Sequence, residues 1–334
     1  MAQYGYRLFK TERMNGRGNT PVAFVDGKWG DFVEHLTRSY ERQIGRKWHE
    51  NPRDAFDSHG NAIPLDPNSR IVRLDWMQRS GMSVFFAVSS GKNDGFRDAM
   101  TAADGAADVS IEHLAPRRQY RGVYTLPPNQ AEGIVALETI SRTCLNTVLT
   151  RWSNEWSEQL AKADGKSGKE SHHCRVRFNQ ITDRAQITSL LNEGDPQEIV
   201  LTEHVAQGNG LPDLVQYRLT APVREKHTVM GTIKRWVTQK GISLQDGIQE
   251  ARALVGPEVA DVDFDECYVS VRHEGQLRHV SPDAYSELFT YDIRSEQRET
   301  RDFYREVNSK MAALGFARTM DLDLNGWPTD LPSL

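Results

Sequence analysis

The hydrophobic pattern in the first half of the chain predicts a series of strands interrupted by two helices. One expected strand, residues 132–137, is a nearly continuous apolar run, which is typical of a strand covered on both faces. The other expected strands cover residues 4–11, 22–25, 70–77, 82–89, 109–114 and 122–126. The expected helices cover residues 29–44 and 145–160, each with apolar residues at helical spacing.

The second half of the chain alternates strand and helix patterns again. Strands are expected at residues 175–179, 198–203, 215–220, 268–272 and 276–280, the last two forming a hairpin. Helices are expected at residues 183–191, 228–239, 244–255 and 295–314. The last helix places Phe303, Val307, Met311 and Leu314 on one stripe. Because only a short acidic tail follows, that apolar stripe must pack against elements that come earlier in the chain.

The strongest boundary signal is residues 162–170, a Gly, Ser and Lys segment with almost no apolar side chain. If the last helix packs on the N-terminal part, the N-terminal domain is discontinuous. The sequence therefore predicts an α+β protein with two domains. A globular α/β domain is expected from residues 1–171 and 293–334, and an inserted α/β domain from residues 172–292.

Composition narrows the class of protein. With 334 residues, 38% hydrophobic residues and a formal net charge of −5, the chain lacks the strongly basic balance of a simple nucleic-acid binder. The cysteines Cys144, Cys174 and Cys267 are odd in number and widely spaced, which is typical of a reducing compartment. No secretory signal and no membrane-spanning window are recognisable. The expectation is a cytoplasmic protein.

Motifs for catalysis and metal binding are weak. Residues 89–92 (SSGK) end a strand but lack the other glycine and the Ser/Thr of a phosphate-binding loop. Residues 172–174 (HHC) lack the paired spacings of a zinc site. Asp261, Asp263 and Asp265 would share one face of an extended segment, where they could hold Mg²⁺ for a nuclease or form an acidic sheet edge. No cofactor is expected.

Cations are grouped in two segments. Arg117, Arg118 and Arg121 lie in one loop between strands. Residues 224–240 contain five cations and one acid, with His227 and Trp236 among them. A helix that buries Ile233, Trp236 and Val237 must turn its lysines and arginines outward, where they can bind phosphates regardless of base sequence. The alternative is an ordinary solvated helix face. The five cations are Arg224, Lys226, Lys234, Arg235 and Lys240.

Three stretches in this order resemble the RexA-like phage-exclusion proteins encoded by prophages. They are residues 133–143 (GIVALETISRT), 215–226 (VQYRLTAPVREK) and 268–278 (YVSVRHEGQLR), the last two followed by helices. Together with the elements around them they span about half of the chain. Residues 51–68, 162–170 and 192–212 look like insertions relative to that family.

The resemblance implies a two-domain α/β homodimer, related in architecture to RdgC, that binds double-stranded DNA without sequence preference. It also implies a RexB-like membrane ion channel, encoded nearby, as a partner. Carried over to matching positions, the implied DNA contacts add Arg142 and Arg218 to the cations above. The implied dimer interface lies in the second domain, with Ile199, Leu201 and Val215 as candidates.

These observations favour a non-enzymatic DNA-binding homodimer that acts as sensor or effector in prophage-mediated phage exclusion. The first alternative is a metal-dependent defence nuclease that uses Asp261, Asp263 and Asp265. The second is an interaction scaffold that binds no nucleic acid.

Overall fold

The fold is that of a computed structural model of the whole chain. The residues that it describes are 4–16, 18–27, 30–66, 69–92, 98–99, 109–110, 117–141, 143–165, 173–181, 183–205, 214–239, 242–256, 262–273, 275–282, 290–293 and 299–332. Helices and antiparallel sheets are both present, so the α+β class predicted from the sequence is confirmed.

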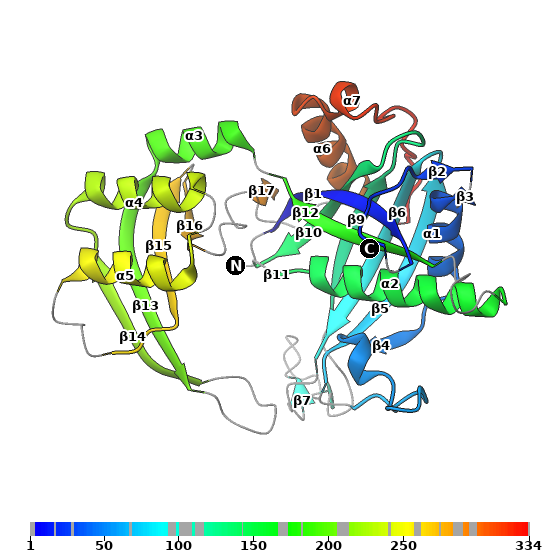
Figure 1. The fold of residues 1–334 in the computed structure, drawn as a ribbon, viewed down its shortest axis with the longest axis horizontal. Coiled ribbons are helices and arrows are strands. Elements are labelled where there is room, and N and C mark those ends of the chain that lie inside the picture. Colours follow the sequence, from blue (N-terminus) through cyan, green and yellow to red (C-terminus); the bar gives the residue numbers. More distant parts are fainter. Residues whose placement is uncertain are drawn as a thin grey trace. The chain divides into compact units, whose positions relative to one another are not determined.

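The chain divides into two compact units. The large unit comprises residues 1–181 and 291–334, and the small unit comprises residues 182–290. The large unit is therefore built from both ends of the chain. Figure 1 shows this in its colours, because the late elements β17 and α6 lie among strands from the first half of the chain.

A large antiparallel sheet forms the centre of the large unit. Its strand order is β12-β1-β10-β9-β6-β5-β4, with β11 beside β10 and β17 beside β1. The strands are β1 (Tyr4–Asn15), β4 (Lys47–His49), β5 (Ile71–Ser80), β6 (Ser83–Gly91), β9 (Arg117–Thr125), β10 (Glu132–Ile140), β11 (Thr143–Cys144), β12 (Cys174–Gln180) and β17 (Thr290–Ile293). Two short pairs lie outside this sheet, β2 (Val25–Asp26) with β3 (Gly30–Asp31) and β7 (Asp98–Ala99) with β8 (Val109–Ser110).

Helices cover both faces of this sheet (Figure 1). On one face pack α1 (Phe32–Glu41) and α2 (Asn146–Ala163), and the 3₁₀ turn η1 (Pro52–Asp54) lies next to α2 and β4. The other face is covered by α6 (Thr300–Ala313), with the short α7 (Phe316–Thr319) after it. Side chains alternate along each strand, so Phe86 faces α1 and α2 whereas Phe85 faces α6.

Local signals explain where the helices of the large unit begin and pack. The carboxylate of Asp31 accepts hydrogen bonds from the backbone N–H groups of Val33 and Glu34, which fixes the start of α1. The ring of Tyr40 lies edge-on to Trp156 of α2 with centroids 5.0 Å apart, and its hydroxyl bonds Ser153 Oγ at 2.7 Å. Aromatic side chains at helical spacing, Tyr40 of α1 and Trp156 of α2, therefore form the contact between these two helices.

The small unit is a four-stranded antiparallel sheet with helices on one face. Its strand order is β14-β13-β15-β16, and Figure 1 shows α4 and α5 lying across these strands. Its core joins Ile199, Leu201 and Val269 of the sheet to Ile233 and Trp236 of α4. Its elements are α3 (Arg184–Glu193), β13 (Asp195–Val205), β14 (Leu214–Pro222), α4 (Lys226–Thr238), α5 (Leu244–Val255), β15 (Glu266–His273) and β16 (Gln276–Val280).

The structure places the boundary between the units later than the sequence does. The predicted second domain begins at residue 172, yet β12 pairs with β1 along seven residues and belongs to the large sheet. The last helix packs its stripe on the N-terminal part, where Phe303, Val307 and Met311 contact the cluster around Tyr6 and Phe85. This helix begins at Thr300, and the predicted start at residue 295 lies outside the described residues.

Most of the predicted strands are present with shifted ends. The hairpin of β5 and β6 turns at Gly81, which has a positive φ of 56°, and the hairpin of β15 and β16 turns at Gly275 with a φ of 77°. Of the predicted strand at residues 22–25, only Val25 lies in a strand, the two-residue β2 that pairs with β3. Strand β4 was not predicted. Of the predicted strand at 109–114, residues 111–114 lie outside the described part of the chain.

Candidate nucleic-acid interface

Helix α4 presents its polar side directly opposite the core of the small unit. Val229, Ile233 and Trp236 are buried in the core, and the indole Nε1 of Trp236 donates a 2.8 Å hydrogen bond to Glu250. At 100° per residue, these positions place Lys234 and His227 on the far side of the helix, and both are exposed. The prediction that the cations of this helix point outward is consistent with this arrangement.

The cations of this segment differ in how they are neutralised. Lys226 forms an ion pair with Asp195, and Arg235 lies 3.3 Å from the carboxylate of Glu250. The side chains of Arg224 and Lys234 are exposed and form neither an ion pair nor a hydrogen bond with any residue that the structure describes. Arg224 and Lys234 therefore keep their full charge for a partner.

Charge is strongly segregated within the small unit. Residues 182–290 contain 17 Asp and Glu against 10 Lys and Arg, a formal charge of −7. Residues 218–240 hold six of those ten cations and one acid, Glu225. An acidic unit thus carries one distinctly basic segment, and its local potential is set by that segment rather than by the sum.

Arg218 belongs to the opposite face of the small sheet. Its neighbour Leu219 pairs with Leu201 on the face under the helices, so Arg218 points to the face without them. There the guanidinium donates a 2.6 Å hydrogen bond to the hydroxyl of Tyr268, whose ring stacks on His279 with centroids 4.1 Å apart. The structure therefore separates Arg218 from the cations of α4.

A second cationic group lies at one end of the large sheet. Arg117 and Arg118 begin β9 and are exposed. Burial raises the pKa of Tyr120, and the positive charges of Arg118 and Arg70 act in the opposite direction. Arg70 lies 3.5 Å from the carboxylate of Glu50, so part of this group is neutralised.

Arg117 is also drawn toward a carboxylate. Asp75 has a side chain that is only 9% exposed, and it lies 2.6 Å from Nε of Arg73 and 3.5 Å from Nη1 of Arg117. Ser89 Oγ and Gln119 Nε2 donate further hydrogen bonds to Asp75 at 2.5 and 2.7 Å. This network neutralises part of the charge at this end of the sheet.

Arg121 is a structural residue, and its assignment to the DNA-contacting group is wrong. It is 1% exposed, and its Nε and Nη2 donate hydrogen bonds to the carboxylate of Glu138 at 2.9 and 2.5 Å. Its guanidinium also lies 4.4 Å from the ring centroid of Phe303 in α6. A phosphate cannot reach a guanidinium that is enclosed between the sheet and a helix.

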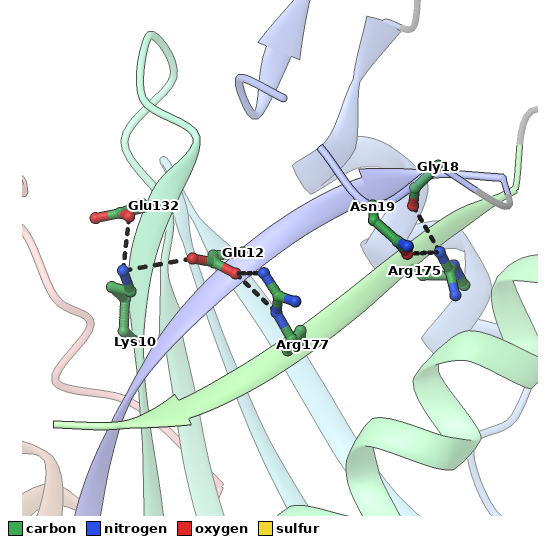
Figure 2. A network of polar contacts seen from close by, with 7 residues as sticks. All are labelled: Lys10, Glu12, Gly18, Asn19, Glu132, Arg175 and Arg177. Atoms are coloured by element: carbon green, nitrogen blue, oxygen red, sulfur yellow. Dashed lines mark hydrogen bonds and ion pairs between the residues drawn. The ribbon is translucent and has the colours of Figure 1, made fainter. Parts of the chain in front are cut away.

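The arginines of β12 are likewise bound within the protein (Figure 2). Arg177 donates hydrogen bonds to Glu12 on β1, which also lies 3.4 Å from Lys10. Burial alone would raise the pKa of Glu12, but its bonds with Arg177 and Lys10 outweigh burial, so the pKa lies below its usual range. Arg175 donates a 2.6 Å bond to the carbonyl of Gly18.

Two of the three proposed dimer residues lie in the core. Ile199 and Leu201 are 2% and 0% exposed and pack under the helices of the small unit, so neither can contact a second copy and that prediction is wrong. Val215 is 54% exposed on β14, which is the outermost strand of its sheet. Alternation along β13 could have shown that Ile199 and Leu201 share the buried face.

The remaining predicted site residues fall partly outside the described chain. Arg142, Lys240 and Asp261 are not among the described residues. Asp263 is exposed, whereas Asp265 binds Nδ1 of His204 at 2.7 Å. Burial alone would raise the pKa of Asp265, but the bonds from His204 outweigh it and lower that pKa. In the described part of the chain, no three His, Cys, Asp or Glu side chains converge in a metal-binding arrangement.

Within the described residues, no helix has the length and apolar character needed to cross a membrane.

Comparison with known proteins leaves the family open. No protein-family model, no curated protein and no solved structure matches the chain.

Proposed function

We propose that this protein binds double-stranded DNA without sequence preference, through the basic segment around α4. The observation that carries the proposal is the pair of exposed cations Arg224 and Lys234, which no described carboxylate neutralises. Three arginines of the large unit, Arg121, Arg177 and Arg73, are instead held by carboxylates of the protein itself. Exposed cations without an internal carboxylate partner are the groups that bind phosphates and release counterions.

The proposal includes a homodimer, because a single basic segment of this size gives weak binding. Two copies related by a twofold axis would present two such segments, and the second would bind at a high effective concentration once the first is bound. Val215 and the outermost strand β14 remain the candidates for contact between copies. No catalytic step is part of this function.

The biological role that we propose is that of a cytoplasmic sensor or effector in prophage-mediated phage exclusion, with a membrane ion channel as partner. This part rests on the resemblance of three sequence stretches to RexA-like proteins. The described residues give less support to the nuclease alternative, because Asp265 is hydrogen-bonded to His204 and Asp261 is outside the described chain.

Fluorescence anisotropy on several unrelated duplexes at low salt tests the proposal. We expect similar affinities for all sequences, and an affinity weakened about tenfold or more by the double substitution Arg224→Ala/Lys234→Ala. The matched control is Lys162→Ala, which removes an exposed lysine paired with Glu158 in the large unit. Absence of binding to every duplex at low salt would refute the proposal, and nicking of plasmid with Mg²⁺ would favour the nuclease.

A further inference from the structure

Two helices of the small unit contain an internal glycine, and only one of these glycines is explained by packing. A Cβ on Gly247 of α5 would lie 1.9 Å from a ring carbon of Pro282, so that position has no room for a side chain. A Cβ on Gly231 of α4 would meet nothing within 4 Å. The fold of the protein therefore gives no steric reason for glycine at position 231.

Glycine at position 231 also weakens the helix that contains it. It lies in the middle of Lys226–Thr238, at an exposed position with ordinary helical backbone. A glycine there loses more backbone freedom on folding than any other residue would, and alanine is the better helix former. An exposed glycine within a helix is useful where another molecule must approach the backbone closely.

The neighbours of Gly231 indicate what that molecule is. At 100° per residue, His227, Gly231, Lys234 and Thr238 fall within about 60° of one another, on the side opposite the buried Val229 and Trp236. Gly231 thus lies between a histidine one turn earlier and the unneutralised Lys234 one turn later. Arg224 precedes the helix at the same end as His227. Gly231 is therefore flanked by a cation toward each end of the helix, Arg224 before it and Lys234 after it.

We propose that the sugar–phosphate backbone of duplex DNA lies across α4 at Gly231, with Arg224 and Lys234 binding phosphates on either side. This inference rests on the proposed function and names the contact point. The helical part from Lys226 to Lys234 rises about 12 Å at 1.5 Å per residue, and Arg224 lies two residues before it. A length of about 12 Å corresponds to three to four nucleotides of one strand at about 3.4 Å each, so the two cations would meet different phosphates.

Glycine is required in this arrangement because a side chain at position 231 would hold the backbone of the nucleic acid away from both cations. A small increase in distance weakens charge-assisted hydrogen bonds, which need donor–acceptor distances below about 3 Å. We therefore expect that affinity falls with the size of the residue at position 231, without any change of charge.

The test compares Gly231→Ala and Gly231→Leu with the wild-type chain in anisotropy titrations on a 20-base-pair duplex. We expect about threefold weaker binding for alanine and about tenfold or weaker binding for leucine, while both proteins stay folded by circular dichroism. The matched control is Ala253→Leu, a neutral enlargement at an exposed position of α5 in the same unit. The control should bind within about twofold of wild type.

The outcomes separate this inference from the function on which it rests. If the wild-type chain binds no duplex at low salt, the proposed function fails. If wild type binds and Gly231→Leu binds equally well, only the contact at Gly231 is refuted. Should Gly231→Leu not fold, Gly231→Ala decides alone. Vesicles containing phosphatidylserine form a third arm, and loss of vesicle binding with unchanged duplex binding would identify a membrane surface and overturn the inference.

Discussion

The buried pair of Arg121 and Glu138 gives the sharpest prediction about stability. Both side chains are fully buried, and the carboxylate of Glu138 also accepts a 3.0 Å bond from the backbone N–H of Arg121. Removing one partner of such a pair leaves an uncompensated buried charge and costs about 3–5 kcal/mol. Glu138→Gln keeps the shape of the side chain but removes its charge, so it should lower the free energy of unfolding by about that amount.

Urea denaturation followed by circular dichroism measures this change. A double substitution, Arg121→Met/Glu138→Leu, removes both charges and should recover most of the loss, because well-packed apolar residues replace buried ion pairs at little cost. Lys162→Ala is the control, since the pair of Lys162 with Glu158 is exposed and contributes about 0.5 kcal/mol or less. A Glu138→Gln protein as stable as wild type would refute this account of Arg121.

Three further predictions concern packing, pH and helix stability. Gly122→Ala should lower stability by about 1–3 kcal/mol, because its Cβ would lie 2.3 Å from the ring of Phe86, and an unchanged melting temperature would contradict the packing. The pKa of Glu12 is lowered because its bonds with Arg177 and Lys10 outweigh burial. The stabilisation of the fold by ionised Glu12 is therefore fully present above the unfolded pKa of about 4.3 and is lost as pH falls through the lower folded pKa. Glu12→Gln should therefore flatten the acid side of the stability profile, measured by urea titrations at several pH values, and identical profiles would argue against the ion pair. Gly231→Ala should raise stability by about 0.5–1 kcal/mol, and a lower melting temperature would show an unrecognised role for the glycine in the fold.

Periodicity predicted the elements whose pairing partners are close in sequence. The helix spacing of Phe32, Leu36 and Tyr40 and the turn at Gly81 are local signals, and the structure confirms the elements that they predict. The strand at residues 175–179 was recognised but assigned to the wrong domain. Its pairing with β1, more than 150 residues earlier, depends on tertiary contacts that no local pattern encodes.

The misassigned Arg121 shows how burial of a charge escapes a local interpretation. Arg121 lies two residues before Val123 on β9, and Glu138 lies two residues after Ala136 on β10. Residues two apart on a strand share a face, so both strands place Arg121 and Glu138 on the face that buries Val123 and Ala136. An acid within an apolar run was the available signal. What the sequence could not show was the register that brings Glu138 against Arg121, and counting positive charges alone therefore overestimated the basic surface.

The cations of α4 could be predicted as exposed, but not as free. Lys226 and Arg235 are neutralised by Asp195 and Glu250, which lie in other elements of the small unit. Only the three-dimensional structure distinguishes these paired cations from Arg224 and Lys234, which have no ion pair with a described residue. The register of β14 places Arg218 on the opposite face of the sheet, so the described cations of residues 218–239 do not form one surface.

The salt dependence of duplex binding tests the central claim most directly. For each phosphate contact, the slope of log K against log salt concentration changes by about 0.9. Removing Arg224 and Lys234 should therefore reduce the slope by about 2 per protomer for every duplex sequence, while Lys162→Ala leaves the slope unchanged. Equal slopes for the wild-type protein and the Arg224→Ala/Lys234→Ala variant would contradict the assignment of the DNA interface to α4.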